Sequence, residues 1–192
     1  MRYLVEKIET LFERFGYKET LTKKENISLL SKRFLIAELE NLEYKSDFTI
    51  VRDQNGKPYF KSNTNCFFNI SHTKNHVAVC FDSLPIGIDI EEVREKKMPV
   101  AQRFFHPKEV EYLQTISEKD IDFAFTQLWT IKEAYVKMTG KGIANNFRNI
   151  NLAPKSFTLN QKYSKNEAQI ESIFLEKEGV FLSICKQREK KK

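Results

Sequence analysis

Two carboxylates occur close together in the stretch LPIGIDIEEV, residues 84–93. Isoleucine at every second position of this stretch predicts a strand that is buried on one face. Asp89 and Glu91 occupy the opposite phase, so their side chains share the other face. Like charges held that close beside a core repel each other, which costs free energy unless a cation lies opposite them. The spacing therefore predicts a cation that faces this strand.

A third carboxylate lies in the apolar pattern of residues 121–139, a predicted helix that ends at Gly140. Trp129, Glu133 and Lys137 are four residues apart and therefore share one face of that helix. Considered alone, Glu133 and Lys137 are better explained as a surface ion pair, which contributes about 0.3–0.5 kcal/mol to helix stability.

The strand and the helix together support a different interpretation. If Asp89, Glu91 and Glu133 converge on one point, a cation is needed among them. Oxygen ligands suit Mg²⁺ or Mn²⁺, and protein-bound Mg²⁺ is normally completed by water and substrate phosphates. Lys137, one helical turn from Glu133, would then contact a phosphate oxygen. The pattern predicts a divalent ion that bridges the protein to a diphosphate.

Further groups suited to phosphate lie in NGKPYF and FFNISH. Lys57 precedes Pro58, which stiffens the chain. Ser71 and His72 end a predicted strand and enter a turn. Ammonium, hydroxyl and imidazole groups all donate hydrogen bonds to phosphate oxygens. For His72 taken without this context, local hydrogen bonding at a strand end is the favoured explanation.

These side chains need elements that bring them together. Apolar spacing predicts helices over residues 4–16 and from about Thr22 to residue 39. It then predicts a strand, an Asn-Gly turn and an extended segment within residues 47–60. Strands are expected over residues 66–71, 76–82, 85–91, 157–159, 168–177 and 179–186, and helices over residues 99–105, 106–113 and 121–139.

The order of these elements, helix then strands and again helix then strands, predicts an α+β fold with two similar lobes that meet near Leu84. Each lobe would be a small sheet packed on a long helix. We expect an N-terminal lobe over residues 1–83 and a C-terminal lobe with the metal site over residues 84–192, with a basic tail over residues 186–192.

Composition restricts the functional class. Apolar residues make up 41% of the 192 residues, which is typical of a globular protein. No apolar run approaches the length of a membrane span, and glutamates interrupt the N-terminal apolar pattern, so neither a membrane nor a secretory protein is expected. The three cysteines form no CxxC pair and favour a reduced, cytoplasmic chain. The net charge of +6 favours an anionic partner.

Four motifs, FNISH, IGIDIE, RFF and LWTIKEAYVKMTGKGI, occur in this order. Together they resemble the 4′-phosphopantetheinyl transferases, specifically the larger, pseudo-dimeric type that activates surfactin synthetase and other peptide and polyketide synthetases. The resemblance covers residues 56–143. It implies a pseudo-dimeric fold and a coenzyme A (CoA) site between the lobes of one monomer.

The resemblance also implies roles for individual residues. Asp89, Glu91 and Glu133 match the metal ligands, and Glu133 is in addition the candidate base. Lys137 matches the lysine that contacts the CoA phosphates. The other positions that match CoA-contacting residues are Arg33, Lys57, Pro58, Ser71, His72 and Lys132. Glu109 matches an acidic residue to which the motif assigns no role.

The implied reaction is Mg²⁺-dependent transfer of the 4′-phosphopantetheine arm from CoA to a serine of an acidic apo carrier protein, with release of adenosine 3′,5′-bisphosphate. Neither nucleic acid nor membrane is an expected partner. Fatty-acid, polyketide and nonribosomal-peptide carriers all expose such a serine and all remain candidates. Two alternatives are a Mg²⁺-dependent nuclease or phosphodiester hydrolase and a non-catalytic module that binds CoA or a carrier protein. The intact set of carboxylates with Lys137 argues against the binding module.

One position departs from the family pattern. The family commonly has serine after RFF, and this chain has His106. Serine is a good helix N-cap, so histidine is expected to cost about 0.5–1 kcal/mol of local helix stability. Pro107, at the first helical position, would offset part of that cost.

Overall fold

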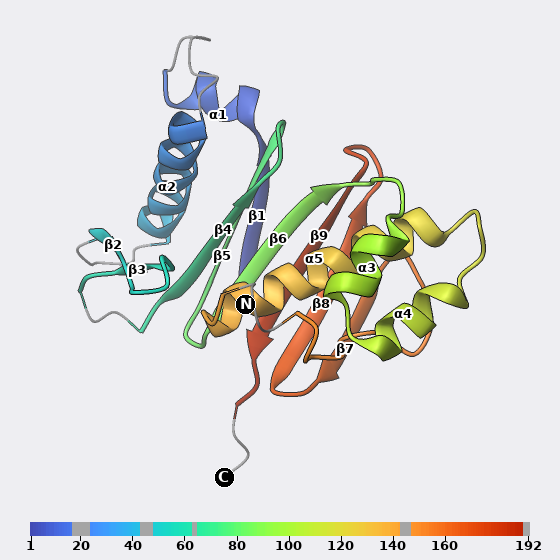
Figure 1. The fold of residues 1–192 in the computed structure, drawn as a ribbon. Coiled ribbons are helices and arrows are strands. Elements are labelled where there is room, and N and C mark those ends of the chain that lie inside the picture. Colours follow the sequence, from blue (N-terminus) through green and yellow to red (C-terminus); the bar gives the residue numbers. More distant parts are fainter. Residues whose placement is uncertain (17–23, 43–47, 63–64, 143–146, 190–192) are drawn as a thin grey trace.

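The computed structural model describes residues 1–16, 24–42, 48–62, 65–142 and 147–189. Its elements, in chain order, are β1 (Arg2–Lys7), α1 (Ile8–Arg14), α2 (Lys24–Asn41), β2 (Ile50–Arg52), β3 (Pro58–Phe60), β4 (Phe67–His72), β5 (His76–Asp82), β6 (Ile86–Glu92), α3 (Met98–Phe104), α4 (Pro107–Gln114), α5 (Ile121–Thr139), β7 (Gln161–Lys165), β8 (Ala168–Leu175) and β9 (Val180–Gln187). The expected α+β class is confirmed (Figure 1).

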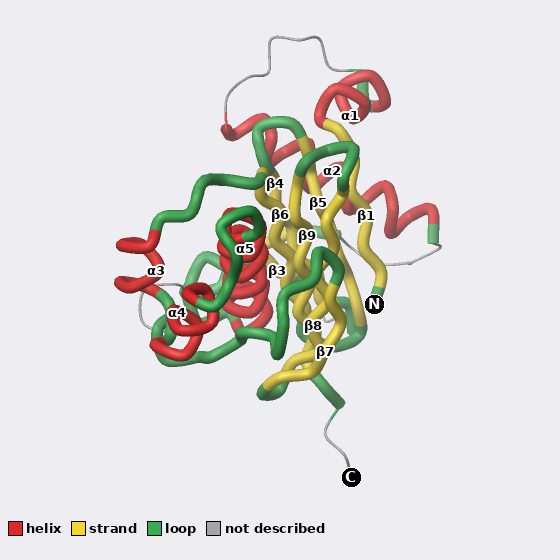
Figure 2. The backbone as a smooth tube through the Cα atoms, turned by 90° about the vertical axis from the view of Figure 1, so that its right-hand side faces the viewer, coloured by secondary structure: helices red, strands yellow, loops and turns green. Residues whose placement is uncertain are grey.

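The strands form antiparallel sheets that helices cover. One sheet has the order β1–β5–β4, a second has the order β6–β9–β8–β7, and β2 pairs with β3. In Figure 1, α1 and α2 lie to the left of the strands, whereas α5 crosses in front of β6, β9 and β8, with α3 and α4 at the right. Figure 2 shows α3, α4 and α5 together beside the strands. One apolar cluster joins α1 and α2 to β4 and β5, another joins α5 to β8 and β9, and a third joins β5 to β6 and β9.

The strand β6 shows the alternation that the sequence predicts. Its isoleucines are at most 1% exposed and pack against β5 and β9. Gly87 and Asp89 face the opposite way, toward α5. A Cβ atom at Gly87 would lie 2.1 Å from the carbonyl oxygen of Ala134, so only glycine lets the helix lie this close to the strand. This close approach sets the height of α5 above the β6 carboxylates.

Helix α5 has the predicted bounds, residues 121–139. It ends at Gly140, whose φ of 70° is left-handed and suits glycine. Ile131, Ala134 and Met138 belong to the buried cluster that joins the helix to β8 and β9. The predicted strands over residues 66–71, 76–82 and 85–91, and the turn before Lys57, are also confirmed.

Two element predictions are wrong. Residues 2–7 form β1, which pairs with β5 from Arg2 opposite Phe81 to Lys7 opposite His76, and the helix begins only at Ile8. The apolar spacing favoured a helix because strand pairing with a distant segment leaves no local signal. The strand expected over residues 157–159 lies instead at residues 161–165. The predicted helix start at Thr22 lies outside the described residues.

No helix in the described ranges combines the length and the apolar character that a membrane crossing requires.

Candidate active site

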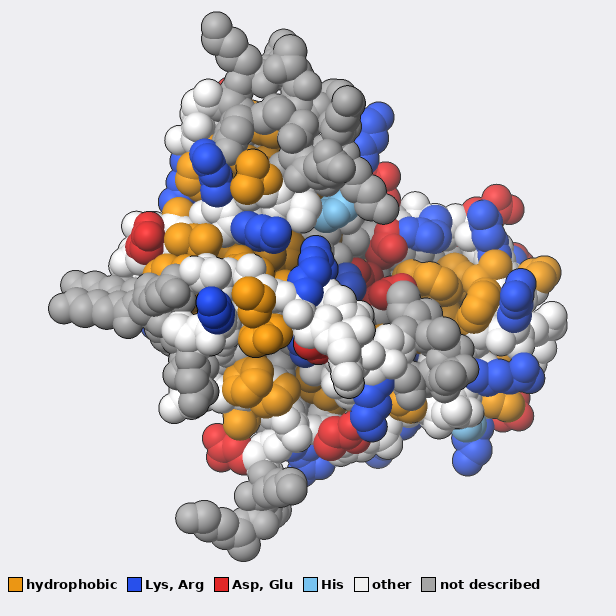
Figure 3. Space-filling model, turned by 60° about the vertical axis from the view of Figure 1, so that its left-hand side comes forward, with side chains coloured by type: hydrophobic (Ala, Val, Ile, Leu, Met, Phe, Trp, Pro, Cys, Tyr) orange, Lys and Arg blue, Asp and Glu red, His pale blue; other side chains and the backbone are white. Residues whose placement is uncertain are grey.

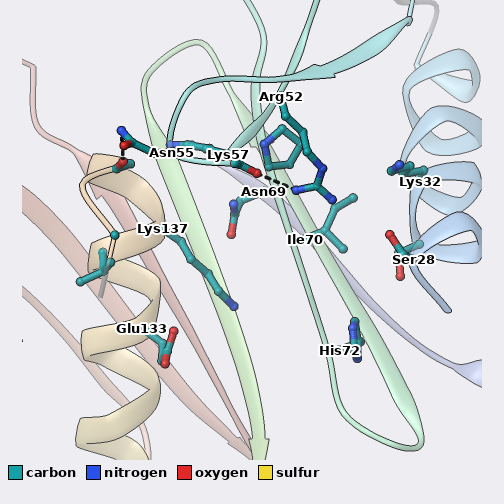
Figure 4. A pocket seen from close by; sticks show the side chains of 16 residues that line it. Ser28, Lys32, Arg52, Asn55, Lys57, Asn69, Ile70, His72, Glu133 and Lys137 are labelled. Carbon is teal, nitrogen blue, oxygen red and sulfur yellow. Dashed lines mark hydrogen bonds between the residues drawn. The ribbon is translucent and has the colours of Figure 1, made fainter. Parts of the chain in front are cut away.

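A cavity of about 330 Å³ opens between α2, the β2–β3 hairpin, β4 and α5 (Figure 4). Residues on both sides of Leu84 line it. Among the described residues, its lining includes Lys32, Arg52, Lys57 and Lys137 but only one carboxylate, Glu133. In Figure 3, lysine and arginine side chains gather near the middle of this side of the molecule, beside a histidine and carboxylates. A cavity of this charge suits an anionic ligand.

At the base of this region, one contact network joins β4, β6 and α5. Lys137 Nζ lies 2.6 Å from Asp89 Oδ1 and donates to Ser71 Oγ at 2.9 Å. Ser71 Oγ donates to the same Asp89 oxygen at 2.8 Å. Asp89 is only 4% exposed, whereas the Lys137 side chain is 28% exposed. The ammonium is therefore fixed on a buried carboxylate and still reaches solvent.

Glu133 lies one turn before Lys137 on α5, and both side chains point into the cavity (Figure 4). Burial raises the pKa of Glu133 to about 7, and the charge of Asp89 adds to the rise while that of Lys137 opposes it. A carboxyl group with a pKa near neutrality is present in both protonation states at neutral pH. It is therefore suited to accept a proton during a reaction.

Glu91, the second carboxylate of β6, forms an ion pair with Arg94. Burial and then the charge of Asp89 raise the pKa of Glu91, and Arg94 opposes this rise. Within the described residues, no three His, Cys, Asp or Glu side chains are arranged so that they hold a metal ion. In this structure, Asp89 forms an ion pair with Lys137, and Glu91 forms one with Arg94.

The donor set nevertheless fits a hard divalent cation. Its side-chain donors are carboxylate oxygens, which Mg²⁺ and Mn²⁺ prefer. Asp89 Oδ2 is buried and has no hydrogen-bond partner in the part of the chain that the structure describes. A buried carboxylate oxygen without a partner is costly, and an ion at this position would satisfy it.

Comparison with known proteins identifies the family of this chain. The sequence model of the 4′-phosphopantetheinyl transferase superfamily matches residues 85–185, more than half of the 192 residues. The chain belongs to the 4′-phosphopantetheinyl transferase superfamily. The matched segment includes β6 and α5, and with them Asp89, Glu91, Glu133 and Lys137.

Curated 4′-phosphopantetheinyl transferases are similar to about half of the chain. The chain is 35% identical to the 4′-phosphopantetheinyl transferase gsp of Aneurinibacillus migulanus over 119 residues, which cover 60% of this chain and 47% of that protein. It is 37% identical to the 4′-phosphopantetheinyl transferase Sfp of Bacillus subtilis (strain 168) over 100 residues, 52% of this chain and 45% of that protein. The chain spans about half the length of the curated relatives it matches.

Lys132, the other lysine of the motif KEAYVK, was expected at CoA, but it is not among the residues that line the cavity. Lys132 is 1% exposed and forms an ion pair with the fully buried Glu109 at 2.7 Å. Its ammonium also donates to the carbonyl of Ile150 at 2.8 Å and lies over the rings of Phe105 and Phe147. A lysine enclosed in this way holds α4, α5 and the segment after residue 147 together and does not reach the cavity.

Glu109, which sequence reasoning left without a role, is the centre of that interior network. Its Oε1 accepts a hydrogen bond from the backbone N–H of Leu152 at 2.6 Å. Its Oε2 accepts one from the backbone N–H of His106 at 2.9 Å. His106 in turn caps α4, because its Nδ1 accepts from the N–H of Lys108 at 3.1 Å. His106 therefore caps α4 in this structure, and its expected cost relative to serine stays a prediction.

Lys57 and Pro58, both expected at CoA, line the cavity. The Lys57 ammonium, however, donates to the carbonyl of Met138 at 2.8 Å, and burial lowers the pKa of Lys57. Asn55 Nδ2 donates to the carbonyl of Gly140 at 3.1 Å. Because the C-terminus of a helix attracts cations and donors, these contacts fix the β2–β3 turn on the end of α5. Lys57 thus shapes the cavity wall in addition to any contact with a ligand.

The other predicted positions divide into two groups. His72 lines the cavity, and Ser71 lies behind it on Asp89. Arg33 is exposed on α2 and does not line the cavity, whereas Lys32, its neighbour, does. Arg52 also lines the cavity, and its guanidinium donates to the carbonyl of Gly56 at 2.6 Å. Sequence reasoning missed Lys32 and Arg52 because neither lies in a superfamily motif, and only the packing of α2 and the hairpin brings them here.

Proposed function

We propose that the chain transfers the 4′-phosphopantetheine arm of CoA to a serine of an apo carrier protein. The observation that supports this best is the pairing of a buried Asp89 with Lys137 and Ser71, beside Glu133, at a cationic cavity of about 330 Å³. In the relatives gsp and Sfp, the matching segment belongs to proteins named 4′-phosphopantetheinyl transferases. Membership in their superfamily supports the same chemistry here.

In the proposed reaction, the carrier serine Oγ attacks the β-phosphorus of CoA. A new P–O bond forms, the bond from that phosphorus to the oxygen it shares with the α-phosphate breaks, and adenosine 3′,5′-bisphosphate leaves. Glu133 is the proposed acceptor of the serine proton, because among the described residues it is the one carboxylate that lines the cavity. Lys137 leaves Asp89 and donates to a diphosphate oxygen, where it offsets developing negative charge.

Asp89, Glu91 and Glu133 would hold a Mg²⁺ or Mn²⁺ ion. The buried Asp89 oxygen without a partner supports this, as does the all-oxygen donor set. When bound, such an ion neutralises charge on the diphosphate and orients it. Lys32, Arg52 and His72 line the cavity and would contact CoA phosphates there.

We further infer that residues 1–83 and 84–192 form two lobes related as in a pseudo-dimer, and that a monomer is sufficient for activity. The cavity draws lining residues from both parts of one chain, which supports this. An acidic carrier is the proposed partner because the chain has a net charge of +6. We propose a cytoplasmic location, where carrier proteins and CoA meet; the burial of all three cysteines as free thiols suits that reducing compartment.

The test is incubation of the protein with Mg²⁺, CoA and an apo carrier protein, followed by intact-mass analysis of the carrier. The proposal predicts a mass gain of one phosphopantetheine arm, with release of adenosine 3′,5′-bisphosphate. An unchanged carrier with cleaved CoA would indicate the hydrolase alternative. An unchanged carrier with intact CoA, across fatty-acid, polyketide and nonribosomal-peptide carriers, would contradict the proposal.

A further inference from the structure

The two carboxylates of β6 are each paired with a cation of the chain itself. Lys137 Nζ lies 2.6 Å from Asp89, and the Arg94 guanidinium contacts Glu91. With both cations in place, at most one formal negative charge is left on Asp89, Glu91 and Glu133. Entry of a divalent ion alone would leave the cluster positive, with the ion and the guanidinium repelling each other. The superfamily motif accounts for Lys137, but it gives no role to Arg94.

The main chain around Arg94 is fixed while its side chain is exposed. The N–H of Arg94 donates to Thr126 Oγ1 on α5 at 3.1 Å, and the N–H of Lys96 donates to Asp122 at 2.9 Å. The Arg94 side chain is 43% exposed, and that of Glu91 is 26% exposed. The guanidinium can therefore leave Glu91 by rotation of its own side chain, without movement of the segment that carries it.

We propose that Arg94 is an internal counter-ion that a divalent cation must displace from Glu91, so that the cation binds well only together with the CoA diphosphate. This inference rests on the proposed function. The diphosphate supplies the negative charge that offsets the added cation and the displaced guanidinium. Binding of CoA and binding of the cation then favour each other, and by linkage each raises the affinity for the other by the same factor. Because of Arg94, the divalent cation and CoA bind to the site together.

The test measures Mn²⁺ binding by electron paramagnetic resonance, with and without CoA and in the absence of any carrier. Solutions of Mn²⁺ with CoA but no protein correct for direct complexation. Arg94→Ala should tighten Mn²⁺ binding about fivefold without CoA, because a partly exposed cation next to a ligand no longer competes. With CoA present, the Mn²⁺ affinities of the wild type and of Arg94→Ala should agree within about twofold. Arg94→Lys should bind Mn²⁺ with nearly the affinity of the wild type, because the positive charge is kept.

Arg103→Ala is the matched control, since it removes the same charge from an exposed residue of α3 whose guanidinium lies over Phe104. It should leave Mn²⁺ binding unchanged. A Glu91→Gln background should abolish the gain from Arg94→Ala, because the effect acts through Glu91. An Arg94→Ala protein that binds Mn²⁺ alone no better than wild type would overturn the proposal, as would an equal gain in Arg103→Ala or the absence of Mn²⁺ binding throughout.

The result is separable from the proposed function. Failure of the wild-type protein to modify any carrier would contradict the transfer reaction while a gain in Arg94→Ala would still establish the counter-ion. Conversely, a carrier that gains mass while Arg94→Ala shows no gain in Mn²⁺ binding would leave the transferase assignment intact and refute the role of Arg94.

Discussion

At the scale of single residues, Glu109 and Lys132 show how a buried ion pair outside the lining of the ligand cavity supports the site. Both side chains are fully buried, and they connect α4, α5 and the chain near Leu152. Lys132 directly precedes Glu133, so its enclosure fixes the rotation of α5 that points Glu133 into the cavity. Burial of two charges is tolerated here because the pair has further hydrogen bonds to the backbone.

Glu109→Gln should lower the free energy of unfolding by about 3–5 kcal/mol, because it leaves the Lys132 ammonium buried without its counter-charge. Urea denaturation followed by circular dichroism measures this. Glu118→Gln is the control: Glu118 pairs with Lys96 but its side chain is 93% exposed, so the loss should stay within about 0.5 kcal/mol. Equal losses of unfolding free energy in the two variants would show that the Glu109–Lys132 pair stabilises the fold no more than an exposed ion pair does.

The residues around the site show what the sequence can predict at the scale of single side chains. Helical spacing places Glu133 and Lys137 on one face, and strand alternation places Asp89 toward them, because both periods are local properties of the backbone. The role of Lys132 could not be read in this way. Its burial depends on α4 and on a segment some twenty residues away, and no spacing rule reports which helix face a later segment covers.

At the scale of elements, the contact between β6 and α5 determines the geometry of the site. Gly87 meets the α5 backbone where a Cβ atom would lie 2.4 Å from the N atom of Met138. The strand therefore carries glycine at the point of contact and a carboxylate two residues later, on the same face. The alternation in IGIDIE predicts the strand. Only the packing of α5 on β6 explains why the second residue of this stretch is glycine.

Gly87→Ala should force α5 away from β6 and so separate Lys137 and Glu133 from Asp89. We expect a loss of about 1–3 kcal/mol in unfolding free energy from overpacking, together with a large loss of transfer rate at a temperature where the protein is still folded. Ile88→Val is the control, because it weakens the same strand by about 0.5–1.5 kcal/mol without moving the helix. A Gly87→Ala protein with the rate of Ile88→Val would contradict this account of the packing.

Element prediction succeeded where the local pattern agrees with the fold. Helix α5 has strong periodicity and a glycine stop, and its bounds were predicted to the residue. Residues 4–7 were misassigned because Leu4 continues the apolar spacing of the helix that follows, whereas pairing with β5 decides their structure. The strand β7 alternates weakly and contains lysines at an edge position, so it left little signal.

At the scale of the whole molecule, Asp82 links the two sheets at the end of β5. Its carboxylate lies 2.9 Å from Lys186 Nζ on β9 and also pairs with the amino group of Met1. Burial by itself raises the pKa of Asp82, but hydrogen bonds from the amino group and Lys186 outweigh it and lower the pKa from 3.8 to about 2. Because the folded-state pKa is depressed, the ionised form stabilises the fold above about pH 4, and this contribution is lost as the pH falls toward 2.

Lys186→Met should therefore raise the pKa of Asp82, which carboxyl-carbon NMR measures directly. The difference in unfolding free energy between the wild type and Lys186→Met should have its largest value near pH 6 and should decrease between about pH 4 and pH 2. Lys162→Met is the control, because Lys162 is 78% exposed in its pair with Glu171 and should leave Asp82 unaffected. A pKa of Asp82 that does not move in Lys186→Met would show that this contact does not link the sheets.

The net charge of +6 leads to a second prediction for the whole molecule. Attraction of an acidic carrier acts over exposed surfaces and is screened over about 8–10 Å, whereas CoA phosphates would be held in a cavity where salt screens less. Raising the ionic strength should raise the KM for the carrier more than the KM for CoA. Steady-state kinetics with each substrate varied at two salt concentrations measures this, and a carrier KM that is flat with salt would contradict it.

The central claim is that Asp89, held at the junction of β4, β6 and α5, is part of a phosphopantetheinyl transfer site. Asp89→Asn keeps the shape of the side chain and removes its charge. The most direct measurement is the initial rate at which an apo carrier gains mass with Mg²⁺ and CoA, compared between this variant and wild type at equal folded fraction. We predict a loss of about 100-fold or more. A rate within about twofold of wild type would contradict the assignment of this site.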